Sequence, residues 1–366
     1  MASASAEVDV RWMALALSLG RRGQGRVWPN PAVGCVLVKD GRLIARGWTQ
    51  DGGRPHAERH ALDQAGDAAR GATAYVTLEP CAHTGKTPPC CDALIAAGVA
   101  RVVVACGDPD PRVAGQGLDR LEAAGIEVVT GVLETEAARD HAGFLNRITQ
   151  HRPLVTLKLA QSLDGRIATS TGESQWITGP KARRRVHAMR ARHDAVMVGA
   201  GTARADLPSL TVRDIGADRQ PLRIVVSNSL DLPQEGPLFE TARDVPVWLV
   251  HGSDAPLALC EIWQETGARL LPVQNKKVEV AEALTTLAAA GLTRVFCEGG
   301  GMLAASLIKA RLVDELVVFS AGIGLGADGL PSIGALALDH LNEAPLFELQ
   351  KTERLGPDLM QVWRAA

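Results

Sequence analysis

The chain has 366 residues, of which 46% are hydrophobic and 22% charged, and its formal net charge is −2. This length and composition favour two globular domains, each with enough apolar material for its own core. The balanced charge excludes the general electrostatic attraction that draws basic proteins to nucleic acid. It still allows a small anionic ligand to be held by a few local arginines or lysines.

The apolar run WMALALSLG near the start of the chain resembles the core of a signal peptide only superficially. Glu7 and Asp9 precede the run, Arg21 and Arg22 follow it, and it has no small-residue cleavage site. Its spacing predicts an amphipathic first helix. No other segment approaches the roughly 18 apolar residues of a membrane span. We therefore expect no membrane partner.

Seven cysteines are unevenly distributed along the chain. An odd number at irregular spacing does not indicate a secreted disulfide framework. Four of them lie singly in or beside apolar runs, where a buried free thiol is expected. These four are Cys35, Cys106, Cys260 and Cys297. The pattern predicts a cytoplasmic protein.

The first part of the chain alternates between strand and helix patterns. Residues 32–48 form two apolar runs around a Lys-Asp-Gly turn, which predicts a β-hairpin, and a helix is expected from near His56 to Gly66. The order that follows is typical of an α/β fold with helices covering a sheet. The expected strands are 72–79, 99–108 and 126–132, and the expected helices are 90–98, 115–125 and 136–150.

The pattern breaks at His151-Arg152-Pro153, because Pro153 biases the residue before it away from helix. We therefore predict two domains, residues 1–150 and 151–366. The second half repeats the α/β pattern without obvious internal repetition of the first. Its expected strands include 154–160, 194–199, 221–227, 245–250, 293–299 and 315–321, and its expected helices include 181–192 and 301–311.

The segments PHAE (55–58) and TLEPCAHTGKTPPCC (77–91) carry the clearest chemical pattern. A His two residues before a Glu, followed by Pro-Cys and a further Cys, is the arrangement of zinc-dependent nucleobase deaminases. One imidazole and two thiolates hold zinc and leave a fourth position for water, whose pKa falls to about 7. We predict His56, Cys81 and Cys90 as zinc ligands and Glu58 as the group that moves protons.

Other uses of these residues fit the sequence less well than zinc. A cytoplasmic protein disfavours a disulfide between Cys81 and Cys90, and no Cys-x-x-Cys redox pair is present. The usual Pro-Cys-x-x-Cys of deaminases is also absent, because eight residues separate the two cysteines. His56 and His60 have the spacing of a zincin but lack its glutamate, so His60 is expected to be a solvated helix residue. Cys91 is expected to pack as a thiol, and its position beside Cys90 makes it the alternative ligand.

These segments, together with PNPAVGCVLV and DPDPRVAGQGLDRLEAAGI, closely resemble the N-terminal domain of the bifunctional riboflavin-biosynthesis deaminase/reductase family. The resemblance covers nearly all of residues 10–150 and includes the extended interval between the zinc cysteines. It implies a cytidine-deaminase-like three-layer α/β domain that deaminates a diaminopyrimidinone carrying a ribosylamino 5-phosphate. It also implies that Asn30 contacts the pyrimidine and that His83 and Lys86 reach the phosphate. Without it, Lys86 would be an exposed loop lysine.

The C-terminal half has no convincing G-x-G-x-x-G dinucleotide motif. FCEGGGMLAASLIKAR (296–311) combines a strand, a three-glycine turn and an amphipathic helix. Backbone N–H groups of such a turn and helix start can bind phosphate. A tight turn that needs positive φ explains the glycines equally well.

KLAQSLDGRIA, GESQWITG, GTARADLPSLTVR and CEGGGMLAASLI resemble the reductase domain of the same family over about residues 153–365. The resemblance implies a dihydrofolate-reductase-like α/β fold and NADPH reduction of the ribosyl group to a ribityl chain. The NADP contacts that it implies are Ala160, Trp176, Thr202, Asp206, Ser227 and the turn Gly300, Gly301, Met302, Leu303, Ala304, Ala305 and Ser306. The substrate contacts that it implies are Lys158, Ser174, Arg190, Leu210, Arg213 and Glu298, with the arginines as phosphate-binding forks.

Two positions depart from the family pattern. The family often has Asp-Asp-Pro where this chain has Asp206-Leu207-Pro208, and the first Asp is kept. It commonly has Asp-Ser after the next strand, where this chain has Ser227-Asn228. A surface strand lysine remains an equal interpretation of Lys158.

The leading hypothesis is a two-step enzyme that binds zinc, at about one per chain, and NADPH, and acts on a small phosphoribosyl pyrimidine. The family further implies a homo-oligomer, either dimer or tetramer. One alternative is a nucleoside or tRNA deaminase fused to an unrelated binding domain, which the charge balance and the long cysteine interval argue against. Another is a non-catalytic protein in which zinc only holds the loop.

Overall fold

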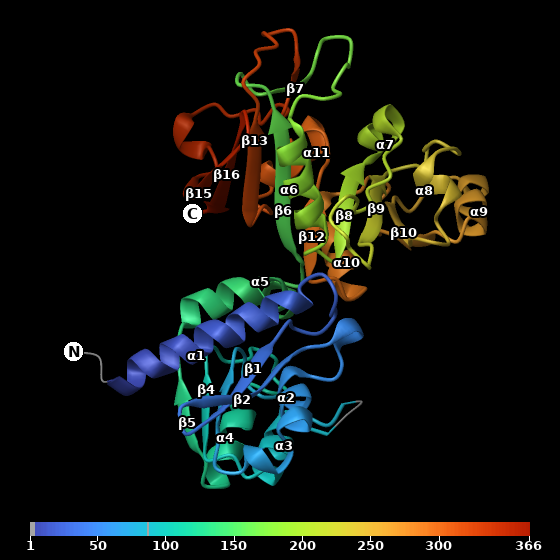
Figure 1. Ribbon diagram of the computed structural model, residues 1–366. Coiled ribbons are helices and arrows are strands. Elements are labelled where there is room, and N and C mark those ends of the chain that lie inside the picture. The colour runs from blue at the N-terminus through green and yellow to red at the C-terminus, as the bar shows by residue number, and fades with distance from the viewer. Residues whose placement is uncertain (1–3, 86–87) are drawn as a thin grey trace. The chain divides into compact units, whose positions relative to one another are not determined.

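The computed structural model describes residues 4–85 and 88–366 (Figure 1). The chain divides into two compact units, Met1–His151 and Arg152–Ala366, called here the N-terminal and C-terminal units. Each unit has its own sheet. The predicted α/β organisation of both halves is confirmed. No helix within the described residues is long and apolar enough to cross a membrane.

The sheet of the N-terminal unit has, among the described residues, five strands in the order β2-β1-β3-β4-β5. The predicted hairpin is present, and its turn places Asp40 and Gly41 at φ values of 50° and 69°. β1 runs antiparallel to β2 and β3, whereas β3, β4 and β5 are parallel. The strands are β1 (Gly34–Lys39), β2 (Arg42–Trp48), β3 (Thr73–Val76), β4 (Arg101–Val104) and β5 (Glu127–Thr130).

Helices cover both faces of this sheet and complete a three-layer unit. Figure 1 shows α1 and α5 together on one face, with α2, α3 and α4 on the other. The helices are α1 (Ala4–Gly20), α2 (Ala57–Ala65), α3 (Cys90–Ala96), α4 (Gln116–Ala123) and α5 (Glu134–Thr149). Short helical turns lie at Arg21–Gly23, Asp51–Gly53 and Gly66–Ala69.

The C-terminal unit is built on a nine-stranded sheet in the order β11-β10-β9-β8-β12-β6-β13-β16-β15. All neighbouring pairs are parallel except those of β16 with β13 and β15. The strands are β6 (Leu154–Gln161), β8 (Ala195–Gly199), β9 (Leu222–Ser227), β10 (Val247–His251), β11 (Arg269–Pro272), β12 (Arg294–Cys297), β13 (Glu315–Ser320), β15 (Phe347–Leu355) and β16 (Asp358–Ala365). A separate pair joins β7 (Arg166–Ala168) to β14 (Leu330–Pro331).

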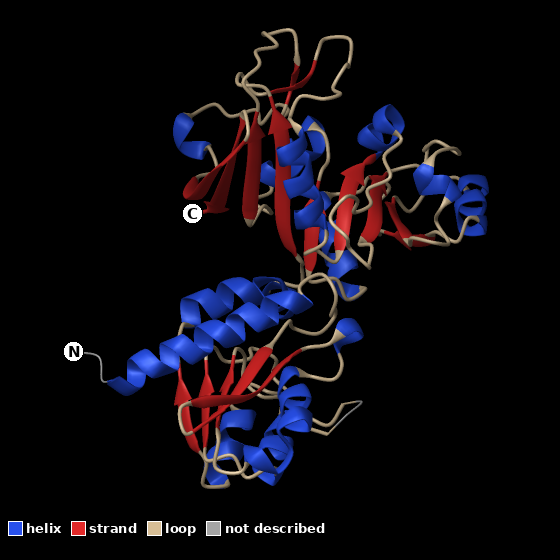
Figure 2. Cartoon of the chain, in the orientation of Figure 1, coloured by secondary structure: helices blue, strands red, loops and turns tan. Residues whose placement is uncertain are grey.

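Helices pack beside this sheet, as Figure 2 shows in blue against the red strands. They are α6 (Pro180–Arg190), α7 (Ala200–Asp206), α8 (Pro237–Glu240), α9 (Leu257–Glu265), α10 (Val280–Ala289) and α11 (Gly301–Lys309), with a short turn at Leu341–Glu343. The adjacent parallel strands β8, β12 and β6 end at the same edge of the sheet. The carboxyl edge of such a sheet is where ligands bind in α/β folds.

One buried ionic network ties α1 to the N-terminal sheet. Asp9 on α1 is 5% exposed and accepts hydrogen bonds at 2.8 Å from both Arg101 terminal nitrogens and from the hydroxyl of Tyr75. These bonds connect the helix to β3 and β4. They let α1 keep a charged residue on the face that also packs Met13 and Leu17 into the core.

Replacing Asp9 with Asn should lower the free energy of unfolding by about 1–3 kcal/mol, because a charged acceptor is lost. The hydrogen bond from Arg101 holds the pKa of Asp9 below its usual value of 3.8. Such a carboxylate stabilises the fold above its unfolded pKa and loses that contribution as the pH falls through its folded pKa. Urea unfolding at several pH values compares the free energy of unfolding of the Asp9→Asn variant with that of the unmodified chain. The difference should be constant near neutrality and should shrink below pH 3.8.

Asp63→Asn is the matched control for this measurement. Asp63 pairs with Arg59 at 2.8 Å on the surface of α2, where both side chains are more than half exposed. Its loss should cost less than about 1 kcal/mol. Equal effects of the two substitutions would contradict the importance of the buried network.

Candidate active sites

Three metal-ligating side chains converge in the N-terminal unit. His56 precedes the first turn of α2, Cys81 lies in the loop after β3, and Cys90 is the first residue of α3. His56 Nδ1 lies 3.7 Å from Cys81 Sγ and 3.4 Å from Cys90 Sγ, and the three ligand atoms lie within 4.8 Å of one another. The loop therefore folds back across the long interval between the two cysteines.

The donor set fits zinc. One imidazole nitrogen and two sulfurs are the ligands that zinc prefers, and three protein ligands leave a fourth position open. The ring of His56 turns Nδ1 towards the sulfurs, while its buried Nε2 has no hydrogen-bond partner within the described part of the chain. The backbone N–H of Cys90 also donates to Cys81 Sγ at 3.3 Å, which favours a thiolate there.

The two candidate thiolates differ in acidity. A hydrogen bond from Cys90 lowers the pKa of Cys81, and the same interaction raises the pKa of Cys90. Cys91 lies outside this group, since its sulfur is directed to the Asp92 carboxylate at 3.5 Å. Burial raises the pKa of the Cys91 thiol to about 11. Cys91 is thus placed as a packing thiol.

Glu58 lies in the first turn of α2, two residues after His56, and is only 3% exposed. Burial raises the pKa of Glu58 to about 7, and the negative charge of Cys81 adds to the rise. A carboxyl group that titrates near neutrality can both accept and donate a proton in one reaction cycle. Its position beside the three ligands suits that role.

The other residues predicted for this site lie in its loops. Asn30 is half-buried, and Gly53 makes room for it, because a Cβ at Gly53 would lie 2.0 Å from Asn30 Nδ2. His83 is half-buried, with its Nδ1 buried and without a hydrogen-bond partner in the described residues. Lys86 lies outside the residues that the structure describes. The expected solvated His60 is instead half-buried, with Nδ1 2.9 Å from Gln50 Nε2.

Glu79 is a residue that the sequence argument missed. It is 4% exposed and accepts backbone hydrogen bonds from Asp108 at 3.4 Å, Gly115 at 3.1 Å and Gly117 at 3.0 Å. A Cβ at Gly117 would lie 2.1 Å from the Pro80 carbonyl, so the approach requires glycine. Glu79 thereby ties the loop after β4 to the strand end that leads to Cys81.

This loop brings two further buried carboxylates, Asp108 and Asp110, which the sequence argument also missed. Burial raises the pKa of Asp108 to about 6, and the charges of Asp110, Glu79 and Cys81 add to the rise. Asp110 is held by Arg112 at 2.5 Å. Two Asp-Pro pairs directly after a strand were the available signal, because a loop at that edge of a parallel sheet faces the site.

A second charged cluster occupies the carboxyl edge of the C-terminal sheet. Arg190 at the end of α6 donates from Nε to Glu298 Oε1 at 2.5 Å and from Nη2 to Oε2 at 3.1 Å. Its Nη1 donates to the Thr211 carbonyl at 2.7 Å. Lys158 on β6 lies 3.8 Å from the same carboxylate. Arg190, predicted as a phosphate fork, is thus engaged by Glu298.

Electrostatics link the members of this cluster. Burial would raise the pKa of Glu298, but the charges of Arg190 and Lys158 outweigh it and hold the pKa below the usual range. Burial lowers the pKa of Lys158, against the attraction of Glu298. Burial of its carboxyl group raises the pKa of Asp206, and Lys158 opposes that rise. The sequence was equally compatible with a surface strand lysine at position 158. In the structure Lys158 is part of the charged cluster.

The three-glycine turn lies beside this cluster. Gly300 precedes the first turn of α11, and its N–H donates to Thr202 Oγ1 at 3.1 Å, which joins two of the predicted NADP contacts. A Cβ at Gly301 would lie 2.5 Å from the Pro331 carbonyl, so a close backbone approach requires glycine there. Further along α11, Met302 is 86% exposed, whereas Ala304 and Ala305 are buried. The side chain of Ser306 donates to the Met302 carbonyl at 3.0 Å.

Other predicted contacts have local partners. The Ser227 hydroxyl accepts from the Leu230 N–H at 3.1 Å, and Leu210 is buried with φ at 53°. The N–H of Arg213 donates to His187 Nδ1 at 3.2 Å, a histidine that sequence reasoning did not single out. The remaining four are Ala160 near the end of β6, Ser174 and Trp176 in the loop before α6, and Leu303 in α11.

Matches to known protein families divide the chain in the same way as its two structural units. Residues 6–106 match the cytidine and deoxycytidylate deaminase zinc-binding region, and residues 153–361 match the RibD C-terminal domain. The chain is 43% identical over 364 residues to riboflavin biosynthesis protein RibD of Escherichia coli (strain K12), covering 96% of this chain and 98% of that protein. The chain belongs to the RibD family.

Solved RibD structures match nearly the full length of the chain. Acinetobacter baumannii RibD superposes with a TM-score of 0.89 at 38% identity, covering 99% of both chains. The Thermotoga maritima relative, a diaminohydroxyphosphoribosylaminopyrimidine deaminase/5-amino-6-(5-phosphoribosylamino)uracil reductase, gives 0.86 at 34% identity, covering 99% of this chain and 100% of that one. This RibD family member is a bifunctional deaminase and reductase of riboflavin biosynthesis, which confirms the family, fold class and paired activities predicted from sequence.

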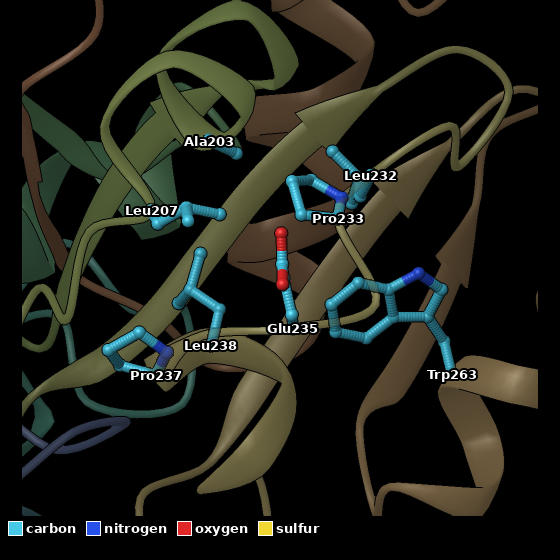
Figure 3. Close-up of a pocket in the computed structure, with 8 residues that line it drawn as sticks. All are labelled: Ala203, Leu207, Leu232, Pro233, Glu235, Pro237, Leu238 and Trp263. Atoms are coloured by element: carbon cyan, nitrogen blue, oxygen red, sulfur yellow. The ribbon is translucent and has the colours of Figure 1, made fainter.

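A small hollow of the C-terminal unit is lined by residues other than those of the charged cluster. In Figure 3 the carboxylate of Glu235 points between apolar side chains, with the indole of Trp263 on one side. The space that a water-sized molecule can reach is about 10 Å³, which holds about one water and no cofactor. The lining residues are Ala203, Leu207, Leu232, Pro233, Glu235, Pro237, Leu238 and Trp263.

Arg190→Ala should lower the free energy of unfolding of the C-terminal unit by about 3–5 kcal/mol, because a buried carboxylate loses its bidentate partner. Arg185→Ala on the same helix is the control, since the Arg185–Glu353 ion pair is only partly buried. That change should cost less than about 1 kcal/mol. Denaturant unfolding of both variants measures the difference, and equal losses would contradict the compensating role of Arg190.

Proposed function

We propose that this chain first deaminates 2,5-diamino-6-(5-phosphoribosylamino)pyrimidin-4-one to 5-amino-6-(5-phosphoribosylamino)uracil and then reduces the ribosyl group to the ribityl chain with NADPH. The observation that carries the proposal is the convergence of His56, Cys81 and Cys90 beside the buried Glu58. The name of the Thermotoga maritima relative supports both steps, because that protein shares the whole chain length.

In the deaminase step, His56, Cys81 and Cys90 would hold zinc. Bound zinc supplies Lewis acidity that makes water nucleophilic at neutral pH. Glu58 accepts a proton from the attacking water and delivers protons to the ring nitrogen and to the departing amine, so that water adds and ammonia leaves. Its pKa of about 7 allows it to do both. Asn30, His83 and Lys86 are proposed to orient the pyrimidine and the phosphate.

In the reductase step, NADPH would lie against Thr202, Asp206 and the turn that begins at Gly300, and would supply the hydride. The carbon that receives hydride is part of a C=O or C=N group, whose heteroatom must receive a proton. Lys158 carries a proton whose release is favoured by burial of the ammonium group. Glu298 holds that ammonium group in position at 3.8 Å.

The remaining proposed contacts frame this site. Arg213 is exposed and free to meet the substrate phosphate through guanidinium donors that its bond to Ser209 leaves over. Arg190 retains donors beyond those used by Glu298 and Thr211. A homo-oligomer and a cytoplasmic location stay predictions from the family and the cysteine pattern.

Glu58→Gln should lower the deaminase rate by roughly 10²- to 10⁴-fold, because the amide cannot move protons. Zinc content should be unchanged, and NADPH should still be oxidised when the variant receives the deaminated intermediate. Ammonia release, metal analysis and NADPH absorbance measure the three quantities. A variant that deaminates normally would support a zinc that only holds the loop, and an unmodified chain that fails to oxidise NADPH with this intermediate would overturn the reductase step.

Cys90→Ser should reduce zinc from about one per chain to a small fraction, because a hard hydroxyl replaces a soft thiolate. The neighbouring Cys91→Ser is a matched control that should retain the metal. Metal analysis after gel filtration compares the two. Loss of zinc in the Cys91 variant alone would transfer the ligand assignment to that residue.

A further inference from the structure

Trp176 is unusually exposed for an aromatic side chain of this size. Its exposed fraction is 65%, in the loop that connects β7 to α6. Large exposed apolar groups in soluble proteins often mark surfaces that bind another molecule. The loop has its own turn bonds, from the Glu173 N–H to Thr169 Oγ1 at 3.1 Å and from the Ile177 N–H to the Ser174 carbonyl at 3.2 Å. These bonds hold the backbone and leave the indole ring to be held by another residue.

Arg183 is that residue. Its guanidinium carbon lies 4.7 Å from the centre of a Trp176 ring, within the range of a cation–π interaction. Nη1 of Arg183 also donates to the Thr178 carbonyl at 2.7 Å, which fixes the guanidinium plane. Within the described residues Arg183 forms no ion pair with a carboxylate. Its positive charge is thus directed to the ring and the loop.

The base of this arrangement is anchored to the sheet. Gly179 precedes α6, and its N–H donates at 2.7 Å to Asp358, a β16 carboxylate that is 3% exposed. A Cβ at Gly179 would lie 3.3 Å from the same carboxylate oxygen, so the close approach favours glycine. In Figure 1, α6 starts beside the end of β6. The bond between Gly179 and Asp358 anchors the start of α6, and the guanidinium of Arg183 is fixed above the Trp176 ring. The face of the indole that is turned away from the guanidinium is then a surface on which a ligand can bind.

A second arginine–tryptophan pair in the same unit shows what is particular to the first. Arg269 lies 4.6 Å from a Trp248 ring, nearly the same separation. Trp248 is 6% exposed on β10, so core packing holds its ring with or without the arginine. Trp176 has little such packing. The stacking interaction therefore determines ring orientation only at Trp176.

We propose that Arg183 is a positioning residue that holds Trp176 with one face open to an aromatic ring of the bound dinucleotide. This inference rests on the proposed reductase function and on the NADP contact that the family resemblance implies for Trp176. Holding the ring before binding spares the complex the entropy of ordering a mobile side chain. The gain from one cation–π contact corresponds to a roughly 3- to 10-fold change in affinity.

The test compares NADPH binding by the full-length chain and three variants, using titration calorimetry and quenching of tryptophan fluorescence. Arg183→Ala should raise the NADPH Kd roughly 3- to 10-fold and raise the KM for NADPH without changing the KM for the pyrimidine. Arg183→Lys keeps a cation over the ring and should recover most of the affinity. Arg269→Ala, which removes the pair at Trp248, should bind NADPH as the unmodified chain does.

The outcomes separate this inference from the function on which it rests. If the unmodified chain does not bind NADPH, the proposed reductase function is wrong and this inference is wrong with it. If it binds NADPH and Arg183→Ala binds equally well, only the positioning role is overturned. An equal loss in Arg183→Ala and Arg269→Ala would also overturn it, because a general loss of stability would then explain both. Circular dichroism melting checks that all variants are folded.

Discussion

Compensation of a buried negative charge is the constraint on which both candidate sites depend. A carboxylate taken out of water is destabilising by several kcal/mol unless opposite charge or hydrogen bonds surround it. In the C-terminal unit, Glu298 receives two bonds from Arg190 and the nearby charge of Lys158. The strands and helices that carry these three residues must meet in one arrangement, so the charged cluster also specifies how α6 packs against β6 and β12.

The N-terminal unit meets the same constraint differently. Glu79 is compensated by three backbone N–H groups, which draw the loop after β4 onto the strand end before Cys81. Glu58 instead has burial as the largest influence on its pKa. Glu79 thus organises a loop through backbone hydrogen bonds, whereas burial raises the pKa of Glu58 to about 7.

Most of the structural elements that the sequence could predict depend on short-range patterns. The hairpin turn at Asp40-Gly41, the helix after His56 and the glycine turn before α11 each depend on neighbouring residues, and the structure contains all three. The partners of Glu79 and Glu298 lie tens to more than a hundred residues away, so no local spacing indicated them. The β15–β16 hairpin was not singled out either, because its exposed edge strand lacks a clear apolar alternation. The family resemblance predicted Arg190 and Glu298 as site residues but gave no indication of their bond to each other.

The division of the chain at residues 151 and 152 has a consequence for gene expression. Each round of translation yields one deaminase unit and one reductase unit, in a ratio that no promoter or ribosome-binding site can alter. The relative capacity of the two reactions can then change only through the turnover of each site. Selection for balanced flux must therefore act on the turnover of each unit, since the copy numbers are fixed at one to one.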